Sequence, residues 1–145
     1  MPRIPATHVG TGPDGAEIFR PIIVVAIEIG GRGIRVAALV DSGADNTLVP
    51  FEFVEPLGVV FADLPDGHGG SGPGGSLDTR RCKGLVRWVK EKVVLMDEFT
   101  VAEPGKGPDA VLLGRADFFK IYIPRFHWHK DPPVFDLDPV IKSKP

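Results

Sequence analysis

Two neighbouring apolar segments constrain the fold of this chain more than any other feature of its sequence. Residues 21–29 and 34–40 are rich in Val, Ile and Ala, and Gly30-Gly31 lies between them. Residues branched at the β-carbon favour strands, and a Gly-Gly pair between two apolar runs is typical of a tight hairpin turn. The sequence therefore predicts a β-hairpin at the centre of the fold.

The density of glycine and proline extends this prediction to the rest of the chain. The 145 residues include 18 Gly and 15 Pro, which is high for a helical bundle and suits short strands joined by turns. A chain of this length corresponds to one domain that can bury a core. We expect an all-β fold in which residues 1–19 form an N-terminal arm and residues 20–145 form the domain. Further strands are expected at residues 59–61, 85–89, 92–96, 99–101, 126–129 and 134–137, and a short helix at residues 115–120.

Charge and cysteine content exclude several classes of protein. Lys and Arg number 17 against 19 Asp and Glu, so there is no excess positive charge to attract nucleic acid or an anionic membrane. The single cysteine, Cys82, excludes an intrachain disulfide framework and a cysteine-rich metal site. No apolar run approaches the roughly 18 residues that span a bilayer, and residues 1–5 lack the apolar stretch of a secretory signal. We expect a cytoplasmic protein with no nucleic-acid or membrane partner.

The second apolar strand ends in a motif that can position a carboxylate. Asp41-Ser42-Gly43-Ala44 follows this strand, and apolar residues resume at 47–50. We expect Gly43 to adopt a backbone conformation closed to other residues, Ala44 to keep the turn small, and the Ser42 hydroxyl to bond to backbone. An isolated Asp-Ser-Gly is more often an ordinary turn. The apolar flanks favour a carboxylate that is held in place rather than merely solvated.

A second motif lies further along the chain, and the two together resemble those of retropepsin-type aspartic proteases. This single-lobed class includes the retroviral proteases. Leu39-Val40-Asp41-Ser42-Gly43-Ala44 matches the family's catalytic motif, and Leu112-Leu113-Gly114-Arg115 matches its second signature. The resemblance covers roughly residues 20–123. It implies a closed β-barrel fold with one short C-terminal helix, and an enzyme that needs no cofactor or metal.

The resemblance also implies roles for individual residues. Asp41 corresponds to the catalytic aspartate, and Ser42 corresponds to the hydroxyl residue that interlocks with its mate across a dimer. Asp45 and Arg115 correspond to a structural ion pair that ties the active-site loop to the C-terminal helix. Gly114 corresponds to the residue that lets the backbone pass close under that loop. Gly43 and Ala44 complete the support of the loop.

A glycine-rich segment occupies the place where the family carries its flap, a hairpin that closes over substrate. Residues 66–76 contain six glycines, and this composition by itself predicts a mobile loop without a packed element. A phosphate cradle is the weaker alternative, because the Lys-Ser/Thr of a P-loop is absent. The residues expected to contact substrate are Gly67, His68, Gly69, Gly70, Ser71 and Gly72.

The number of carboxylates bears on the mechanism. Peptide hydrolysis by aspartates needs two carboxyl groups, one ionised to accept a proton from water and one protonated to bond the scissile carbonyl. This chain has a single Asp-Ser-Gly motif. The second carboxylate must therefore come from a second chain, and we expect a homodimer with Asp41 and its mate facing each other across a two-fold axis.

Three other segments have simpler interpretations. His127-Trp128-His129 places two imidazoles on one strand face, but no third ligand is evident, so we expect an exposed face and no metal site. Arg80-Arg81-Cys82-Lys83 is expected to be a solvated turn. Cys82 is expected to be a lone thiol without a redox role, although the basic residues beside it would favour the thiolate. Retroviral proteases end in a strand that helps to build the dimer interface. Phe135 and Leu137 could pair across the two-fold axis in the same way.

Two functional hypotheses follow from these observations. The leading hypothesis is an aspartic endopeptidase that acts on an extended peptide or protein substrate as a homodimer. The alternative is a catalytically silent peptide-binding or dimerisation module with the same fold, since a fold does not guarantee activity. A protease that cleaves only its own precursor or one partner is a third, weaker idea. Oligomeric state discriminates between the first two, because a strictly monomeric chain cannot assemble the pair of aspartates.

Overall fold

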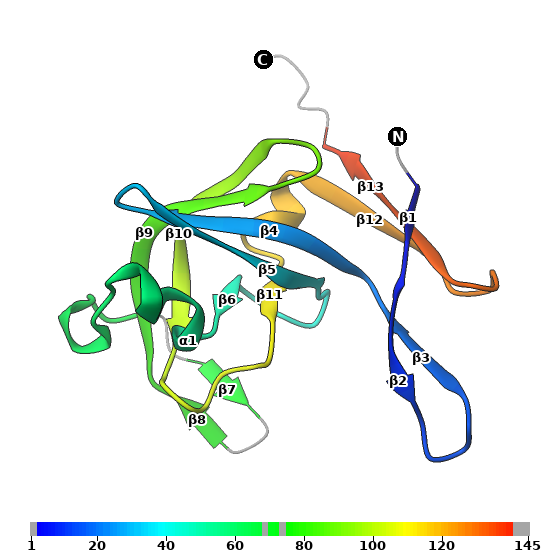
Figure 1. Cartoon of the computed structure of the whole chain (residues 1–145), viewed down its shortest axis with the longest axis horizontal. Helices are drawn as coiled ribbons and strands as arrows, with labels where there is room; N and C mark the ends of the chain where they lie inside the picture. Colours follow the sequence, from blue (N-terminus) through cyan, green and yellow to red (C-terminus); the bar gives the residue numbers. More distant parts are fainter. Residues whose placement is uncertain (1–2, 68–69, 73–74, 141–145) are drawn as a thin grey trace.

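A closed barrel of six strands forms the centre of the molecule (Figure 1). The computed structural model describes residues 3–67, 70–72 and 75–140, with only the backbone of residues 70–72, 75 and 76. The strands follow one another around the barrel in the order β10-β6-β11-β5-β4-β9. Their bounds are β4 (Ile22–Ile29), β5 (Arg32–Val40), β6 (Leu48–Val49), β9 (Thr79–Trp88), β10 (Val93–Ala102) and β11 (Val111–Leu113).

The predicted central hairpin is present as β4 and β5. These strands pair antiparallel from Ile22 opposite Leu39 to Ile29 opposite Arg32. Gly30 and Gly31 form the turn with φ values of 56° and 82°, the left-handed conformation that a two-residue hairpin turn requires and that glycine tolerates. Alternate residues of β4 face inward and are buried, and they join a core in which Val86, Val101 and Leu113 are also fully buried.

The expected strands at 85–89, 92–96 and 99–101 are parts of two longer strands, β9 and β10. These two strands pair along their length, with register shifts between Val94 and Met96 and between Met96 and Glu98. The basic cluster at residues 80–83 lies inside β9, so the prediction of a solvated turn there is wrong. The alternation of a strand explains this difference, because it buries Cys82 while Arg81 and Lys83 remain exposed.

Helical segments are few and short. The α-helix α1 (Phe51–Val54) follows β6 and continues into the 3-10 turn η1 (Glu55–Leu57). Residues 59–61, expected as a short strand, instead lead into the 3-10 turn η2 (Phe61–Asp63). The expected C-terminal helix at 115–120 is reduced to the 3-10 turn η3 (Phe118–Lys120), which Asp117 caps. Among the described residues, no helix is long and apolar enough to cross a membrane.

A three-stranded sheet packs beside the barrel and joins both ends of the chain. Its order is β1-β13-β12, formed by Arg3–Pro5, Val134–Pro139 and Tyr122–His127 respectively. Phe135 and Leu137 of β13 are fully buried in the core of their own chain. They are therefore not available to pair across a two-fold axis, because the side chains that looked free in sequence fill the space between sheet and barrel.

The expected N-terminal arm contains regular structure. Strand β1 belongs to the three-stranded sheet, and β2 (Thr7–Thr11) pairs antiparallel with β3 (Glu17–Arg20) in a two-stranded hairpin. Neither β2 nor β3 pairs with any other described strand. Figure 1 shows this hairpin projecting away from the barrel.

Candidate active site

Asp41 lies directly after the last residue of β5, at an end of the barrel. Strands β5 and β11 run parallel here, with Val40 opposite Leu113. The Asp41 backbone N–H donates to the Leu113 carbonyl at 3.1 Å. The aspartate is therefore held by two neighbouring strands, and it is half-buried rather than fully solvated.

The turn after Asp41 fixes one of its carboxylate oxygens. The Gly43 N–H donates to Asp41 Oδ1 at 2.9 Å, and the Ala44 N–H donates to the Asp41 carbonyl at 3.2 Å. Gly43 does not adopt a left-handed conformation, so the expected reason for a glycine at this position is wrong. A Cβ at position 43 would lie 3.2 Å from Asp41 Oδ1. Glycine is favoured there because it allows the backbone to approach the carboxylate.

Ser42 and the other oxygen of Asp41 remain open. Ser42 is exposed, and its hydroxyl has no hydrogen-bond partner among the described residues, so the expected bond from this hydroxyl to backbone is not formed. Asp41 Oδ2 likewise has no protein partner in the described part of the chain. One oxygen is thus positioned by backbone while the second can bind a water or another group.

The loop is tied to the segment after β11 by three contacts. The Arg115 N–H donates to the Ala44 carbonyl at 2.9 Å, and the Ala116 N–H donates to the Asp45 carbonyl at 2.8 Å. The side chains of Asp45 and Arg115 form an ion pair, which brings together the two residues that the resemblance pairs. Because both side chains are largely exposed, the ion pair itself contributes little stability. The two backbone bonds hold the segments in register.

Gly114 passes against the backbone of the active-site loop. A Cβ at this position would lie only 2.3 Å from the Asn46 carbonyl carbon and 2.8 Å from Asn46 Cα. Neither segment can move away easily, since Ala44 and Asp45 are bonded to Arg115 and Ala116 on one side of the crossing and Thr47 is bonded to the Gly114 N–H on the other. A side chain at position 114 is therefore excluded by packing.

The sequence analysis missed a polar pair beneath the loop, formed by Thr47 and Asp117. Thr47 is fully buried. Its hydroxyl donates to Asp117 Oδ1 at 2.5 Å, its N–H donates to Asp117 Oδ2 at 3.2 Å, and its hydroxyl oxygen accepts from the Gly114 N–H at 3.1 Å. Asp117 also accepts from the Phe118 N–H at 2.7 Å. An aspartate directly before a short helical segment is a capping signal, and it could have drawn attention to Asp117.

The glycine-rich segment forms a hairpin rather than a structureless loop. Strands β7 (Gly70–Gly72) and β8 (Gly75–Leu77) pair antiparallel. His68 and Gly69, two of the residues expected to contact substrate, lie outside the described residues. Gly67 lies at the base, where its N–H donates to the Thr79 carbonyl at 2.8 Å. No described contact joins this hairpin to Asp41.

Arg80 anchors the base of the same hairpin. Its guanidinium donates to the Leu64 carbonyl at 3.2 Å and to Asp78 Oδ2 at 3.3 Å. It also lies over the Phe61 ring, 5.0 Å from the ring centroid. A residue that was expected in a solvated turn therefore joins the segments before and after the hairpin.

Cys82 does not have the character of a reactive thiol. Burial within β9, together with the charge of Glu98, raises the pKa of the Cys82 thiol. The raised pKa agrees with the expectation of a lone thiol without a redox role. The charges of Arg81 and Lys83 do not favour the thiolate, because these side chains are exposed while the sulfur lies inside.

The two histidines near the C-terminus do not form a metal site. The rings of His127 and His129 lie 5.8 Å apart, and His127 Nε2 lies 2.8 Å from Asp136 Oδ2. Among the described residues, no group of three or more His, Cys, Asp or Glu side chains could hold a metal ion. Ile123 and Arg125, on the face of β12 that carries His127, are exposed as expected, while His127 itself is half-buried.

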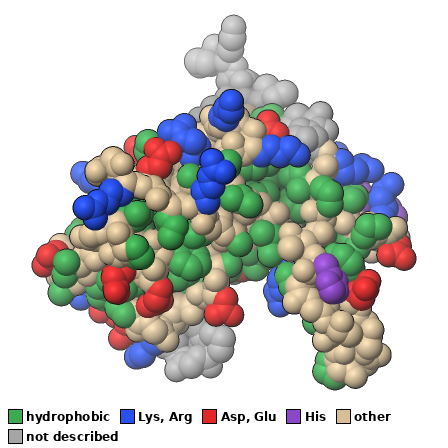
Figure 2. Space-filling model, in the orientation of Figure 1, with side chains coloured by type: hydrophobic (Ala, Val, Ile, Leu, Met, Phe, Trp, Pro, Cys, Tyr) green, Lys and Arg blue, Asp and Glu red, His purple; other side chains and the backbone are tan. Residues whose placement is uncertain are grey.

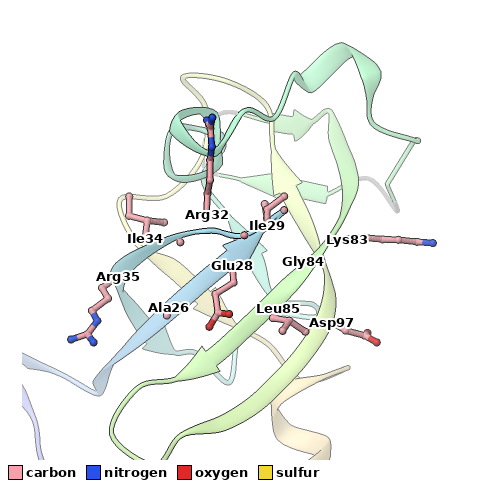
Figure 3. Close-up of a pocket in the computed structure, with 13 residues that line it drawn as sticks. Ala26, Glu28, Ile29, Arg32, Ile34, Arg35, Lys83, Gly84, Leu85 and Asp97 are labelled. Atoms are coloured by element: carbon pink, nitrogen blue, oxygen red, sulfur yellow. The ribbon is translucent and has the colours of Figure 1, made fainter.

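A broad hollow on the barrel surface lies away from Asp41. It is formed around the β4–β5 turn and the middle of β9, and Asp41 is not among its lining residues. Figure 3 shows Arg32, Arg35 and Lys83 around it, pointing away from one another. Because these charges do not converge on a common point, the hollow lacks the arrangement of a binding site.

Solved aspartic proteases have a similar structure. The retropepsin-like aspartic protease from Rickettsia conorii matches with a TM-score of 0.57 and 14% identity, over 93% of this chain and 98% of that one. The EIAV protease in complex with the inhibitor HBY-793 matches with a TM-score of 0.51 and 24% identity, over 67% of this chain and 83% of that one. No family model and no curated protein matches this chain. At these identities the likeness concerns the fold.

Proposed function

Because the chain has a retropepsin-type fold, we propose that it is an aspartic endopeptidase whose active site forms between two copies. The observation that carries this proposal is the geometry of Asp41. Its carboxylate stands at a strand end with Oδ1 bonded to the Gly43 N–H at 2.9 Å and Oδ2 open. A positioned carboxylate with one free oxygen suits the binding and activation of water.

Two such carboxylates complete the chemistry of peptide hydrolysis. At a separation of about 3 Å the pair cannot hold two negative charges, so it carries one shared proton. The ionised carboxylate accepts a proton from water as the water oxygen attacks the carbonyl carbon, and the protonated one donates to the carbonyl oxygen. These transfers leave a tetrahedral intermediate with two hydroxyl groups. When its C–N bond breaks, one carboxyl proton passes to the leaving nitrogen, and one hydroxyl of the intermediate returns a proton to the other carboxylate. The products are a carboxylic acid and an amine, and the pair again shares one proton.

The second carboxylate is assigned to a second copy because this chain has a single Asp-Ser-Gly motif. The open hydroxyl of Ser42 lies in the residue next to Asp41, and we assign it to contacts between the two loops. The β7–β8 hairpin is proposed as the flap that covers an extended peptide. Backbone hydrogen bonds of the strand-addition type suit this hairpin, since its paired residues include three glycines.

One observation favours the alternative of a silent peptide-binding or dimerisation module. Strand β13 pairs within its own chain, between β1 and β12. A dimer built by exchange of C-terminal strands is therefore not available to this chain. If no other surface joins two copies, Asp41 has no mate and hydrolysis cannot proceed.

Cleavage of a mixed peptide library tests the proposal. The protein is assayed at high concentration from acid to neutral pH, as wild type, as Asp41→Asn, and as Asp97→Asn. Asp97 is an exposed carboxylate on β10, and its substitution is the matched control. We expect cleavage by wild type and Asp97→Asn and none by Asp41→Asn. Equal cleavage by Asp41→Asn, or none by wild type in a sample shown to be dimeric, contradicts the proposal.

A further inference from the structure

We infer that the β2–β3 hairpin is a dimerisation arm that packs against a second copy of this chain. The inference rests on the proposed function, in which two copies of the chain form one active site. It assigns the surface that holds the two copies together, and it concerns residues 7–20, which lie outside the active-site loop.

The edges of the terminal sheet are poorly suited to backbone pairing with a partner chain. Strand β13 lies in the middle of the sheet, so its backbone groups are used by β1 on one side and β12 on the other. The two outer strands carry Pro5 and Pro124. Proline has no N–H to donate and blunts an edge strand against pairing with another chain. Strand pairing at this sheet is therefore an unfavourable way to join two copies.

The β2–β3 hairpin lies outside the barrel and the terminal sheet, and Glu17 and Phe19 of β3 line a hollow shared with the turn between β12 and β13. The hairpin pairs with no other described strand, and Figure 2 shows an open hollow between this lobe and the barrel. A two-stranded hairpin alone is marginally stable in water and needs a surface to pack on. Val9 and Ile18 are nevertheless 45% and 39% exposed. Packing against another molecule would give the hairpin the surface it needs and would bury Val9 and Ile18.

The hairpin is a formed element rather than a loose tail. At its tip the Gly12 N–H donates to the Ala16 carbonyl at 2.7 Å, and the Ala16 N–H donates to Asp14 Oδ1 at 3.0 Å. On one face the rings of His8 and Phe19 lie 5.3 Å apart. A preformed arm loses little conformational entropy when it binds a partner.

The base of the hairpin lies beside the catalytic aspartate. The Pro21 carbonyl, directly after β3, accepts from the Val40 N–H at 2.9 Å, and Val40 precedes Asp41. A second copy that brings its own Asp41 to within a few ångströms must therefore approach the base of this arm. In a two-fold dimer each arm meets the same surface of the other copy, so the contact is made twice.

Sedimentation velocity on the full chain tests the inference. The double variant Val9→Glu, Ile18→Glu places charge on the two exposed apolar positions. The matched control is Val94→Glu on β10, where the side chain is 43% exposed. We expect the dimer dissociation constant to rise about tenfold or more in the double variant and to stay within about twofold in the control. An unchanged dissociation constant in the double variant overturns the inference.

A crosslinking measurement supports the test if the double variant folds poorly. A photoreactive phenylalanine analogue replaces Ile18 in an isotopically heavy copy, which is mixed with light wild type. Crosslinks between heavy and light chains support the arm, and crosslinks confined to the heavy chain overturn it. A wild type that stays monomeric at high concentration overturns both the arm and the paired aspartates. A dimer weakened by the double variant but without Asp41-dependent cleavage supports the arm and contradicts the protease.

Discussion

Gly114 and Thr47 show how single residues support the candidate active site without taking part in its chemistry. The backbone of Gly114 crosses Asn46 too closely for any Cβ. The buried Thr47 hydroxyl bonds both the Gly114 N–H and Asp117. Because buried polar groups are costly when left unpaired, this small network favours one position of the loop that carries Asp41.

Gly114→Ala tests the close crossing at the scale of one residue. The added Cβ meets backbone rather than a flexible side chain, so we expect a loss of about 1–3 kcal/mol in the free energy of unfolding, measured by urea denaturation. The matched control is Gly33→Ala, because a Cβ at that position lies 3.5 Å from its nearest neighbour and finds room. The control should stay within about 0.5 kcal/mol of wild type. Equal stability of Gly114→Ala and Gly33→Ala would contradict the close approach of the Gly114 backbone to Asn46.

At the scale of elements, one carboxylate joins the three strands of the terminal sheet. Asp136 of β13 accepts from Arg3 Nε of β1 at 3.3 Å and hydrogen-bonds His127 Nε2 of β12 at 2.8 Å. These contacts, His127 first and Arg3 second, hold the pKa of Asp136 below its ordinary value. Protonation of Asp136 therefore weakens the attachment of β13 to both β1 and β12.

The pH dependence of stability tests this junction. The pKa of Asp136 is lower in the folded chain than its ordinary value of about 3.9. Its contacts therefore stabilise the fold when the pH is above that ordinary value. The stabilisation is lost as the pH falls through the lowered pKa. We expect the unfolding free energy of wild type to fall more steeply than that of Asp136→Asn between about pH 5 and pH 2. Arg3→Gln retains the contact with His127 and should be intermediate. If the unfolding free energies of wild type and Asp136→Asn change in parallel with pH, the contacts of Asp136 with Arg3 and His127 do not stabilise the sheet.

At the scale of the whole molecule, this chain supplies half of the proposed active site. The barrel places Asp41 at one end, the terminal sheet uses both ends of the chain internally, and the β2–β3 hairpin extends from a base beside Asp41. A proposed dimer of this kind assembles its catalytic pair only when two copies meet. Its activity is therefore coupled to protein concentration.

Mixing wild type with Asp41→Asn tests whether the site is shared. At a fixed amount of wild type, an equal amount of the variant converts half of the wild-type chains into mixed dimers with one aspartate. After exchange we expect activity to fall to about one half, and to fall further with excess variant. Adding Asp97→Asn instead should not lower activity. Activity unaffected by Asp41→Asn would show that each chain acts alone.

Local patterns in the sequence predicted the central hairpin and the strand end at Asp41, whereas residues 112–115 were singled out by their resemblance to a family motif. The hairpin and the strand end depend on neighbouring residues alone, namely alternating branched side chains, a Gly-Gly turn and a polar strand end. Predictions for individual side chains in other segments were less successful. The residues at 80–83 looked like a solvated turn because their charges are adjacent, but a strand divides adjacent residues between two faces.

The sequence by itself determined the all-β character and the position of Asp41 at a strand end, because these follow from composition and local periodicity. Only the tertiary structure decided that Thr47 bonds Asp117 and Gly114, at separations of 70 and 67 residues. It also decided that β13 is enclosed by its own chain while the β2–β3 hairpin pairs with no other described strand. Contacts between segments distant in sequence depend on how the barrel closes, and no local pattern specifies that closure.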